Sequence, residues 1–383
     1  MIARILPSLR RSFLIFVGVI TIVVLGFLLW PSPIDPLPYE PAPGAPLTGP
    51  LAPNSALTEA ELLGDGRLNI PEDVAFDSEG RLYTATGDGR LLRLTREAGS
   101  AERVEMVAEL GGHPLGLIVG PNDVLYVANH GVGLQAVEPD GTVRLLADRF
   151  GERPILFADD LDVSREGVVY FSDASSRFNN TTLDTGPPYL PLDLLEGRPH
   201  GALYAYDTRT GEIRLLLGDL YFANGVALTS AEDAVLVVET ARHRVRRLWL
   251  EGPRAGETDI LIGDVPGLAD GITSDRRGYL YVTLQTLRTP LFDTFLAPRP
   301  WAKALAAKVP RGILRRSGGR YGLVVVYDEA GQPVASLHDP EGQTAFSVAN
   351  AVPHEGRLYL GSLGNDAIAV VPNPVAGDAA IIK

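Results

Sequence analysis

The chain has 383 residues, with 34 basic and 47 acidic side chains and a formal net charge of −13 at pH 7. This balance leaves no surplus of positive charge to neutralise phosphates, so it argues against nucleic acid as a partner. The sequence contains no cysteine. Disulfides and thiolate metal sites are therefore excluded, and any metal must be held by oxygen or imidazole.

The first thirty residues carry the clearest local signal. Three arginines precede an uncharged, mostly apolar run over residues 12–30, which as a helix would cross a bilayer core of about 30 Å. A cleaved signal peptide usually has a shorter apolar run, and no small-x-small cleavage site follows Trp30. A buried core helix would show a polar face. We therefore predict a cytoplasmic N-terminus over residues 1–11 and a transmembrane anchor over residues 12–30.

Charge predicts the orientation of this anchor. Positive charge lies on its N-terminal side, and no Lys or Arg follows until Arg67. This asymmetry predicts a single-pass membrane protein with the rest of the chain on the periplasmic, lumenal or extracellular side. Residues 31–53 are rich in proline, which predicts a semi-rigid, extended linker rather than a folded unit.

From about residue 70 onward the chain repeats one unit, a β-branched strand, a turn with Gly or Asp, and a second strand around Leu-Tyr. The six copies are PEDVAFDSEGRLYTA from Pro71, HPLGLIVGPNDVLYVA from His113, FADDLDVSREGVVYFS from Phe157, FANGVALTSAEDAVLVVE from Phe222, LADGITSDRRGYLYVT from Leu268 and SVANAVPHEGRLYLGS from Ser347. Their spacing suits propeller blades of about 40–50 residues. We predict an all-β, six-bladed β-propeller over residues 54–383, with insertions near 174–200 and 287–319.

One position of the repeat carries polar side chains in most copies. It lies two residues before the Val, Leu or Ile of the inner strand, and its occupants are Glu72, Leu115, Asp159, Asn224, Asp270 and Asn350. Inner strands line the central channel of a propeller, so these side chains are expected to meet around one axis. Crowded carboxylates repel each other unless a cation joins them, and carboxylate and amide oxygens suit Ca²⁺ better than zinc.

A simpler interpretation is that acidic and amide residues open strands as turn formers. This interpretation accounts for the Asp and Asn positions one at a time. It accounts poorly for Glu72, and it does not explain why all of them share one phase of the repeat.

Several long segments carry a resemblance to a known family. PEDVAFDSEGRLY, FADDLDVSREGVVYFSD, LYFANGVALTSAEDAVLVVET, SLHDPEG and GRLYLGSL resemble the strictosidine synthase-like propellers, above all the adipocyte plasma membrane-associated protein branch, which also has an N-terminal signal anchor. The pattern is more distantly similar to gluconolactonase, paraoxonase and phosphotriesterase propellers. The resemblance implies a calcium-dependent hydrolase fold. Its metal ligands fall on Glu72, Asp159, Asn224 and Asp270, and Asn350 is kept only as a rim contact.

The chain departs from the family pattern at three places. Asp159 stands where the family usually has Asn, which makes the site more anionic, and Gly271 removes one further ligand that many relatives have. The catalytic glutamate of true strictosidine synthases would fall near Asn350 or Ala351. Without it, we do not expect condensation of an amine with an aldehyde.

Three residues are candidates for catalysis, the third to a lesser extent. The resemblance suggests Asp270 as ligand and as nucleophile or base together. His113 opens the second blade at the predicted channel mouth and is a candidate base, as is His130 to a lesser extent, although a histidine in a turn is usually structural. Serine-hydrolase, zinc-protease, P-loop and dinucleotide motifs do not occur in the sequence.

The fifth-blade insertion combines basic and apolar residues over residues 298–316. Its basic residues are Arg299, Lys303, Lys308, Arg311, Arg315 and Arg316, beside Trp301, Leu305 and Ile313. This stretch predicts either a helix packed on the propeller or a surface that lies on an anionic membrane or gates apolar substrates.

Two classes of function follow. The first is a membrane-anchored, extracytoplasmic, Ca²⁺-dependent esterase or lactonase whose metal polarises the carbonyl or phosphoryl oxygen of a small apolar substrate. The second is a non-catalytic propeller, with a structural calcium site and a protein or lipid partner on its surface, because a fold does not determine a function.

Overall fold

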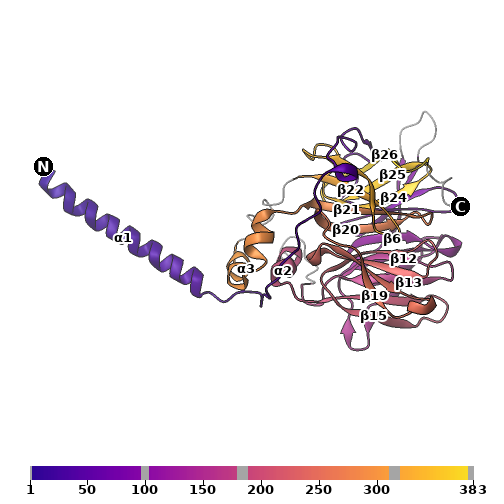
Figure 1. Ribbon diagram of the computed structural model, residues 1–383, viewed down its shortest axis with the longest axis horizontal. Helices are drawn as coiled ribbons and strands as arrows, with labels where there is room; N and C mark the ends of the chain where they lie inside the picture. The colour runs from indigo at the N-terminus through magenta and orange to yellow at the C-terminus, as the bar shows by residue number, and fades with distance from the viewer. Residues whose placement is uncertain (1, 96–102, 179–188, 310–319, 378–383) are drawn as a thin grey trace.

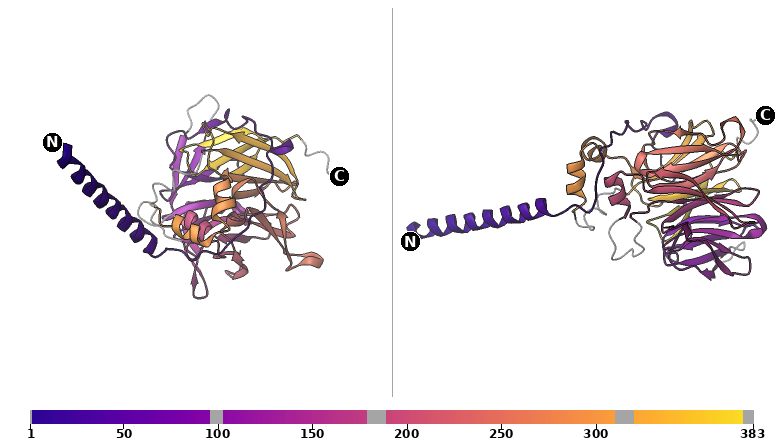
Figure 2. Two further views of the ribbon diagram at one scale, coloured as in Figure 1. Left: turned by 60° about the vertical axis from the view of Figure 1, so that its left-hand side comes forward. Right: turned by 90° about the horizontal axis from the view of Figure 1, so that it is seen from below.

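The computed structural model describes residues 2–95, 103–178, 189–309 and 320–377. Six four-stranded antiparallel sheets lie side by side around a central axis (Figures 1 and 2). The inner strands of successive blades touch in chain order, and the first touches the last. The predicted six-bladed propeller is confirmed.

Five blades are built from strands that follow one another in the chain, inner strand first. They are β2 (Pro71–Phe76), β3 (Leu82–Thr86), β4 (Arg90–Thr95) and β5 (Arg103–Glu109); β6 (His113–Val119), β7 (Leu125–His130), β8 (Gly133–Val137) and β9 (Val143–Ala147); β12 (Ala158–Val163), β13 (Val168–Asp173), β14 (Gly201–Asp207) and β15 (Ile213–Leu220); β16 (Ala223–Leu228), β17 (Ala234–Glu239), β18 (Arg244–Trp249) and β19 (Thr258–Ile262); β20 (Gly267–Ser274), β21 (Tyr279–Leu287), β22 (Gly322–Asp328) and β23 (Pro333–Asp339). A small hairpin, β10 (Arg149–Phe150) with β11 (Arg153–Pro154), precedes the third blade.

The sixth blade takes strands from both ends of the propeller. β24 (Val348–His354), β25 (Arg357–Ser362) and β26 (Ile368–Pro372) come from the C-terminal end, and β1 (Glu61–Leu63) adds the outer strand by pairing with β26. The ring is therefore held closed by backbone hydrogen bonds between the first and last strands, and β26 is left without a free edge.

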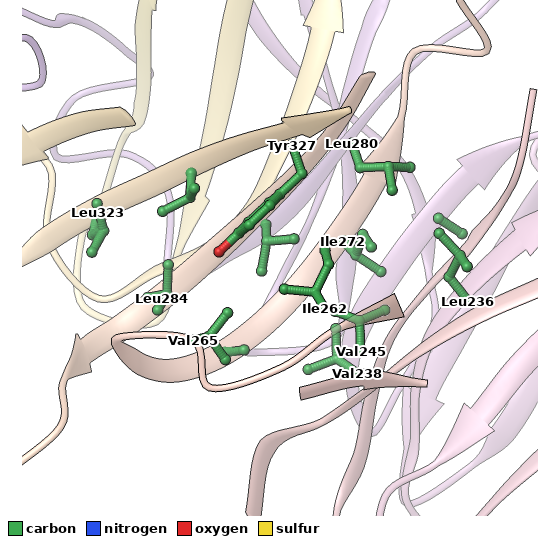
Figure 3. Packing of buried hydrophobic residues seen from close by; sticks show 14 of the residues in the cluster. Leu236, Val238, Val245, Ile262, Val265, Ile272, Leu280, Leu284, Leu323 and Tyr327 are labelled. Atoms are coloured by element: carbon green, nitrogen blue, oxygen red, sulfur yellow. The ribbon is translucent and has the colours of Figure 1, made fainter. Parts of the chain in front are cut away.

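The core lies between the blades. Figure 3 shows one such layer, in which Leu236 and Val245 of the fourth blade face Ile272, Leu284 and Tyr327 of the fifth. Because both faces of a blade are covered by its neighbours, β17 is buried along its whole length. The outer strand β19 alternates between exposed and more buried positions instead, as expected at the rim.

The N-terminal helix α1 (Ile2–Leu29) extends away from the propeller (Figure 1). In the part of the chain that the structure describes, no helix is long and apolar enough to cross a membrane. The transmembrane anchor over residues 12–30 stays a prediction.

The proline-rich segment over residues 31–53 contains one short 3₁₀ turn, Gly49–Leu51, and lies against the propeller. The backbone N–H groups of Leu37, Tyr39 and Ala45 donate to carbonyls of the propeller insertions and loops at 2.9, 2.9 and 2.8 Å. Ile34 and Leu51 are buried. Composition indicates the stiffness of such a segment, but the contacts depend on its partners, so they could not be predicted.

Both predicted insertions contain helices, α2 (Tyr189–Glu196) in the first, and a π-helical turn, η5 (Leu291–Leu296), and α3 (Pro300–Ala306) in the second. The described residues also form the short 3₁₀ turns η1 (Gly49–Leu51), η2 (Pro121–Asp123), η3 (Thr240–Arg242) and η4 (Gly252–Arg254). α2 and α3 lie between α1 and the blades (Figures 1 and 2).

The topology determines which face carries these insertions. Each insertion follows the second strand of its blade, and the end of that strand pairs with the beginning of the inner strand, as in Ala158 with Asp173 and Gly267 with Leu287. The insertions therefore lie on the face of the propeller where the inner strands begin. We call this the entry face.

Candidate functional site in the central channel

Each inner strand has a β-bulge close to its beginning. In β2, for example, Pro71 pairs with Thr86 and Val74 with Thr84, so β2 contains one residue more than β3 over this stretch. The same irregularity occurs in the inner strands of the other five blades. A bulge redirects side chains and is common beside functional sites.

The first bulge position of all six blades surrounds one small cavity. Its occupants are Glu72, Leu115, Asp159, Asn224, Asp270 and Ala349. The cavity measures about 10 Å³, which is room for about one water or one ion. The four predicted metal ligands are thus brought together, and their role as ligands stays a prediction.

Asn350 belongs to the next position of the repeat. In β24 the register shifts between Val348 and Ala351, which makes Ala349 the equivalent of Glu72 and Asn350 the equivalent of Asp73. The repeat pattern of the sequence predicts Asn350 at the first position, two residues before Val352, but the register of β24 puts it at the second, directly before Ala351. Its Oδ1 accepts from the N–H of Ala351 at 3.0 Å, but Asn350 still lines the cavity.

Two functional residues were missed from sequence, Asp73 and Asp160. The carboxylate of Asp73 accepts from the N–H groups of Val74 at 2.7 Å and of Leu117, in the next blade, at 2.8 Å. Asp160 does the same with Leu161 at 2.8 Å and Val226 at 2.9 Å. Each carboxylate therefore ties two neighbouring inner strands together. In the sequence, the adjacent acidic pairs Glu72-Asp73 and Asp159-Asp160 are the only feature that could have indicated this role.

Glycine occupies this second bulge position in the second, fourth and fifth blades, as Gly116, Gly225 and Gly271. A Cβ on Gly225 would lie 2.4 Å from the N atom of Ile272, and one on Gly271 would lie 2.5 Å from the carbonyl oxygen of Ala349. Neighbouring inner strands approach so closely here that no side chain fits. The channel is narrow at this level because the backbones themselves meet.

Five carboxyl groups are buried around the cavity, those of Glu72, Asp73, Asp159, Asp160 and Asp270. Burial, reinforced by the neighbouring carboxylates, raises the pKa of Glu72 and of Asp159 well above the ordinary range. Burial raises the pKa of Asp270 to about 7, although hydrogen bonding from the side chains of Gln285 and Asn224 lowers it; the amide of Asn224 donates to Oδ1 of Asp270 at 2.6 Å. Such crowding of acids is costly unless they bind protons or a cation.

Two oxygens of this cluster are buried and have no hydrogen-bond partner among the described residues, Oε2 of Glu72 and Oδ2 of Asp270. A buried acceptor without a partner is uncommon, and a bound ion, a water molecule or a proton would satisfy it. In the described ranges, no three His, Cys, Asp or Glu side chains are already close enough together to hold a metal ion. The fit to a hard cation therefore rests on these two oxygens and on the all-oxygen donor set.

His113 and His130 form a buried pair at the same end of the channel. They are register partners on β6 and β7, with ring centroids 6.4 Å apart, and His130 stacks on Phe157 at 4.2 Å. Neither ring nitrogen of His113 has a hydrogen-bond partner among the described residues. Burial lowers the pKa of His113 to about 4, so its imidazole is neutral near pH 7. His113 lies near the cavity but does not line it.

Apolar side chains cover the entry side of the cavity. Leu115, Phe157 and Phe222 pack in one cluster with Leu190 and Leu194 of α2. Of these, Leu115 also lines the cavity, so this cluster joins the candidate site to the insertion helix.

Three basic residues of the fifth-blade insertion, Arg299, Lys303 and Lys308, lie in the part of the chain that the structure describes. Lys303 is buried, and its Nζ donates to the carbonyl of Leu37. Arg299 donates to the carbonyls of Thr294 and Phe295. The predicted residues Arg311, Arg315 and Arg316 lie outside the described residues.

Comparison with known proteins agrees with this architecture. The strictosidine synthase family model matches residues 159–253, and the model for the N-terminal part of strictosidine synthase-like proteins matches residues 49–94. The six-bladed fold and these two family matches together define the class of the protein as a strictosidine synthase-like propeller. The adipocyte plasma membrane-associated protein of Bos taurus is 38% identical over 378 residues, which cover 92% of this chain and 88% of that protein. The chain belongs to the adipocyte plasma membrane-associated protein family, and the predicted resemblance is confirmed.

Solved structures share the fold. A gluconolactonase from Xanthomonas campestris superimposes with a TM-score of 0.59 at 19% identity, over 90% of this chain and 97% of that one. Regucalcin from Agrobacterium tumefaciens, described as a calcium-binding protein, has a TM-score of 0.52 at 14% identity, over 81% and 92% of the two chains.

Proposed function

We propose that the chain is a calcium-dependent hydrolase of the esterase or lactonase type. In this proposal α1 holds it in a membrane, with the N-terminus in the cytoplasm and the propeller on the periplasmic, lumenal or extracellular side. The observation that carries the proposal is the pair of buried, unpartnered oxygens of Glu72 and Asp270 within one cluster of carboxylates. The gluconolactonase and the calcium-binding regucalcin among the proteins of the same fold support it.

Glu72, Asp159, Asn224 and Asp270 would hold the calcium ion. When bound, the ion supplies a Lewis acid that polarises a carbonyl or phosphoryl oxygen. The amide of Asn224 holds one oxygen of Asp270 by hydrogen bonding, which leaves the other for the ion or a substrate. Asp73 and Asp160 position the ligand-bearing strands through their bonds to backbone N–H groups.

Asp270 and His113 are the candidates for moving a proton. Asp270 would act as nucleophile or base from within the ligand set. The ring nitrogens of His113 are free of partners among the described residues. Burial keeps the ring neutral and able to accept a proton, but its pKa of about 4 makes it a weaker base than an exposed histidine.

The substrate class follows from the covering of the cavity. The cavity itself holds about one ion. In this proposal a substrate binds on its entry side, where the buried side chains of Leu115, Phe157 and Phe222 would have to move apart to admit it. These side chains are apolar and offer no charge. They favour a small, apolar ester or lactone.

The alternative is a scaffold or binding protein with a structural calcium site. The small cavity and its apolar cover favour this alternative, because both separate the ion from solvent.

Hydrolysis with and without a chelator separates the two functions. The full-length chain in detergent is assayed with aryl esters, lactones and phosphotriesters, beside Asp270→Asn and the exposed control Asp140→Asn. We expect hydrolysis that a calcium chelator abolishes, that Asp140→Asn retains, and that Asp270→Asn loses even at saturating calcium. Bound calcium without chelator-sensitive hydrolysis would favour the scaffold, and full activity of Asp270→Asn would reject the role of Asp270.

A further inference from the structure

The outer surface of the fifth-blade insertion carries exposed apolar side chains. Leu291, Phe295 and Trp301 are 64%, 42% and 60% exposed, and the rings of Phe295 and Trp301 meet edge to face at 6.0 Å. We call these three residues the insertion patch. Large aromatic side chains gathered in water are unfavourable and usually mark a contact surface.

Folding of the insertion does not require this patch. The opposite side of the same elements is already packed, with Phe292, Leu296 and Ala306 against a core that includes Ile34 and Leu192. An ordinary surface helix has one apolar face. Here both faces are apolar, so the outer one is available for a partner.

The insertion is also bound to the end of α1. The ammonium group of Lys308 donates to the carbonyls of Phe27 at 3.2 Å and Leu28 at 3.1 Å, and it lies 5.7 Å from the ring centroid of Phe27. A cation at the C-terminal end of a helix is favourable. Figure 1 shows α3 beside this end of α1. Phe27, Leu28, Leu29 and Trp30 are themselves exposed.

The chemistry of these neighbouring surfaces fits the boundary of a lipid bilayer. Tryptophan and phenylalanine beside cationic groups are typical of the membrane–water interface. Arg299 lies over the ring of Phe295 at 5.0 Å, and Lys308 adds a second cation, which suits anionic headgroups. A protein partner would have to cover the insertion patch together with the apolar end of α1, whereas a bilayer accepts both at one depth.

We propose that the insertion patch rests in the interfacial layer of a bilayer beside the end of α1. Because the insertion lies on the entry face, this contact turns the entry face toward the membrane, where apolar molecules concentrate. The inference goes beyond the proposed hydrolysis and does not depend on it.

The sequence offers a direct test, since it has three tryptophans, Trp30, Trp249 and Trp301. Full-length variants that keep one tryptophan and replace the other two with phenylalanine are reconstituted in vesicles of phosphatidylcholine and phosphatidylglycerol. Lipids brominated close to the headgroup quench tryptophans at that depth. We expect a roughly twofold or larger loss of Trp301 emission relative to vesicles without bromine.

Trp249 is the matched control. It ends β18, which runs parallel to the inner strand of its blade because two antiparallel pairings separate them. Trp249 therefore lies on the face opposite the entry face, and its emission should not change. Replacing Leu291 and Phe295 with serine should reduce quenching of Trp301 and leave that of Trp30 unchanged.

Unquenched Trp301 would overturn the proposal, whatever Trp30 shows. Equal quenching of Trp249 would also overturn it, because the chain would then be adsorbed without a preferred face. Quenching of Trp30 reports separately on the predicted anchor, so failure of the anchor and failure of the patch are distinguishable.

Discussion

Adjacent acidic residues of the channel have different contacts. Within the described residues, no hydrogen bond joins the carboxylate of Asp159 to the neighbouring blade, whereas that of Asp160 accepts from the amides of Leu161 and Val226. The bulge in β12 allows both side chains to line the same cavity, which the ordinary alternation of a strand would prevent. One carboxylate of the doublet is thus available for a ligand while the other holds the strands.

Asp160→Ala should lower the free energy of unfolding by about 2–4 kcal/mol, because it leaves two buried amides without acceptors. Urea unfolding followed by circular dichroism measures this. Asp140→Ala, on an exposed turn, is the control and should change the value by less than about 0.5 kcal/mol. Equal stability of the two variants would contradict the strand-tying role.

Because His113 is buried, we expect the stability of the fold to depend on pH. Its pKa falls from about 6.5 in the unfolded chain to about 4 in the fold because of burial. The folded state therefore favours the neutral ring. The contribution of the neutral His113 ring to the free energy of unfolding is fully present above pH 6.5. It is lost as the pH falls toward 4, and the loss amounts to at most about 3 kcal/mol.

Comparison of the wild type with His113→Gln isolates this effect from that of the buried carboxyl groups, whose raised pKa values act in the opposite direction. Between pH 7.5 and 5, the free energy of unfolding of the wild type should fall relative to that of the variant. Parallel curves for the two proteins would show that the His113 ring is not held neutral by burial.

At the scale of elements, Glu196 at the end of α2 connects the proline-rich segment to the propeller. Its buried carboxylate accepts from the N–H of Asp35 at 2.8 Å, and it lies 2.6 Å from Nε2 of His200 and 3.2 Å from Nε of Arg177. Its backbone carbonyl accepts from Leu37. A short helix thereby fixes a segment more than a hundred residues away in the chain.

Glu196→Ala should release this segment, because the carboxylate is the shared acceptor of several donors. We expect a loss of about 2 kcal/mol in stability and faster cleavage within residues 31–53 by a nonspecific protease. The exposed Glu212→Ala is the control. Unchanged cleavage in Glu196→Ala would mean that other contacts hold the segment.

The blades and the gathering of Glu72, Asp159, Asn224 and Asp270 could be predicted from sequence, since a repeated unit places equivalent residues around one axis. The position of Asn350 could not, because it depends on where a bulge lies within β24. The three residues of β1 are too short for a strand pattern. The contacts of Glu196 depend on distant partners, so no local pattern indicates them.

At the scale of the whole molecule, several features lie together on one face. The inner strands begin there, the insertions rise from it, and α2 covers the apolar cluster beside the cavity. The proline-rich segment and α3 connect this face to α1 (Figure 1). The arrangement links the orientation of the helix to that of the entry face.

Calcium content is the measurement that tests the account most directly. The full-length chain and two matched variants, Glu72→Gln in the channel and Glu79→Gln on an exposed hairpin, are dialysed against calcium and analysed by atomic emission. We predict about one calcium ion per chain in the wild type and in Glu79→Gln, and a loss in Glu72→Gln. Absence of calcium from the wild type, or full retention by Glu72→Gln, would contradict a calcium site at this position.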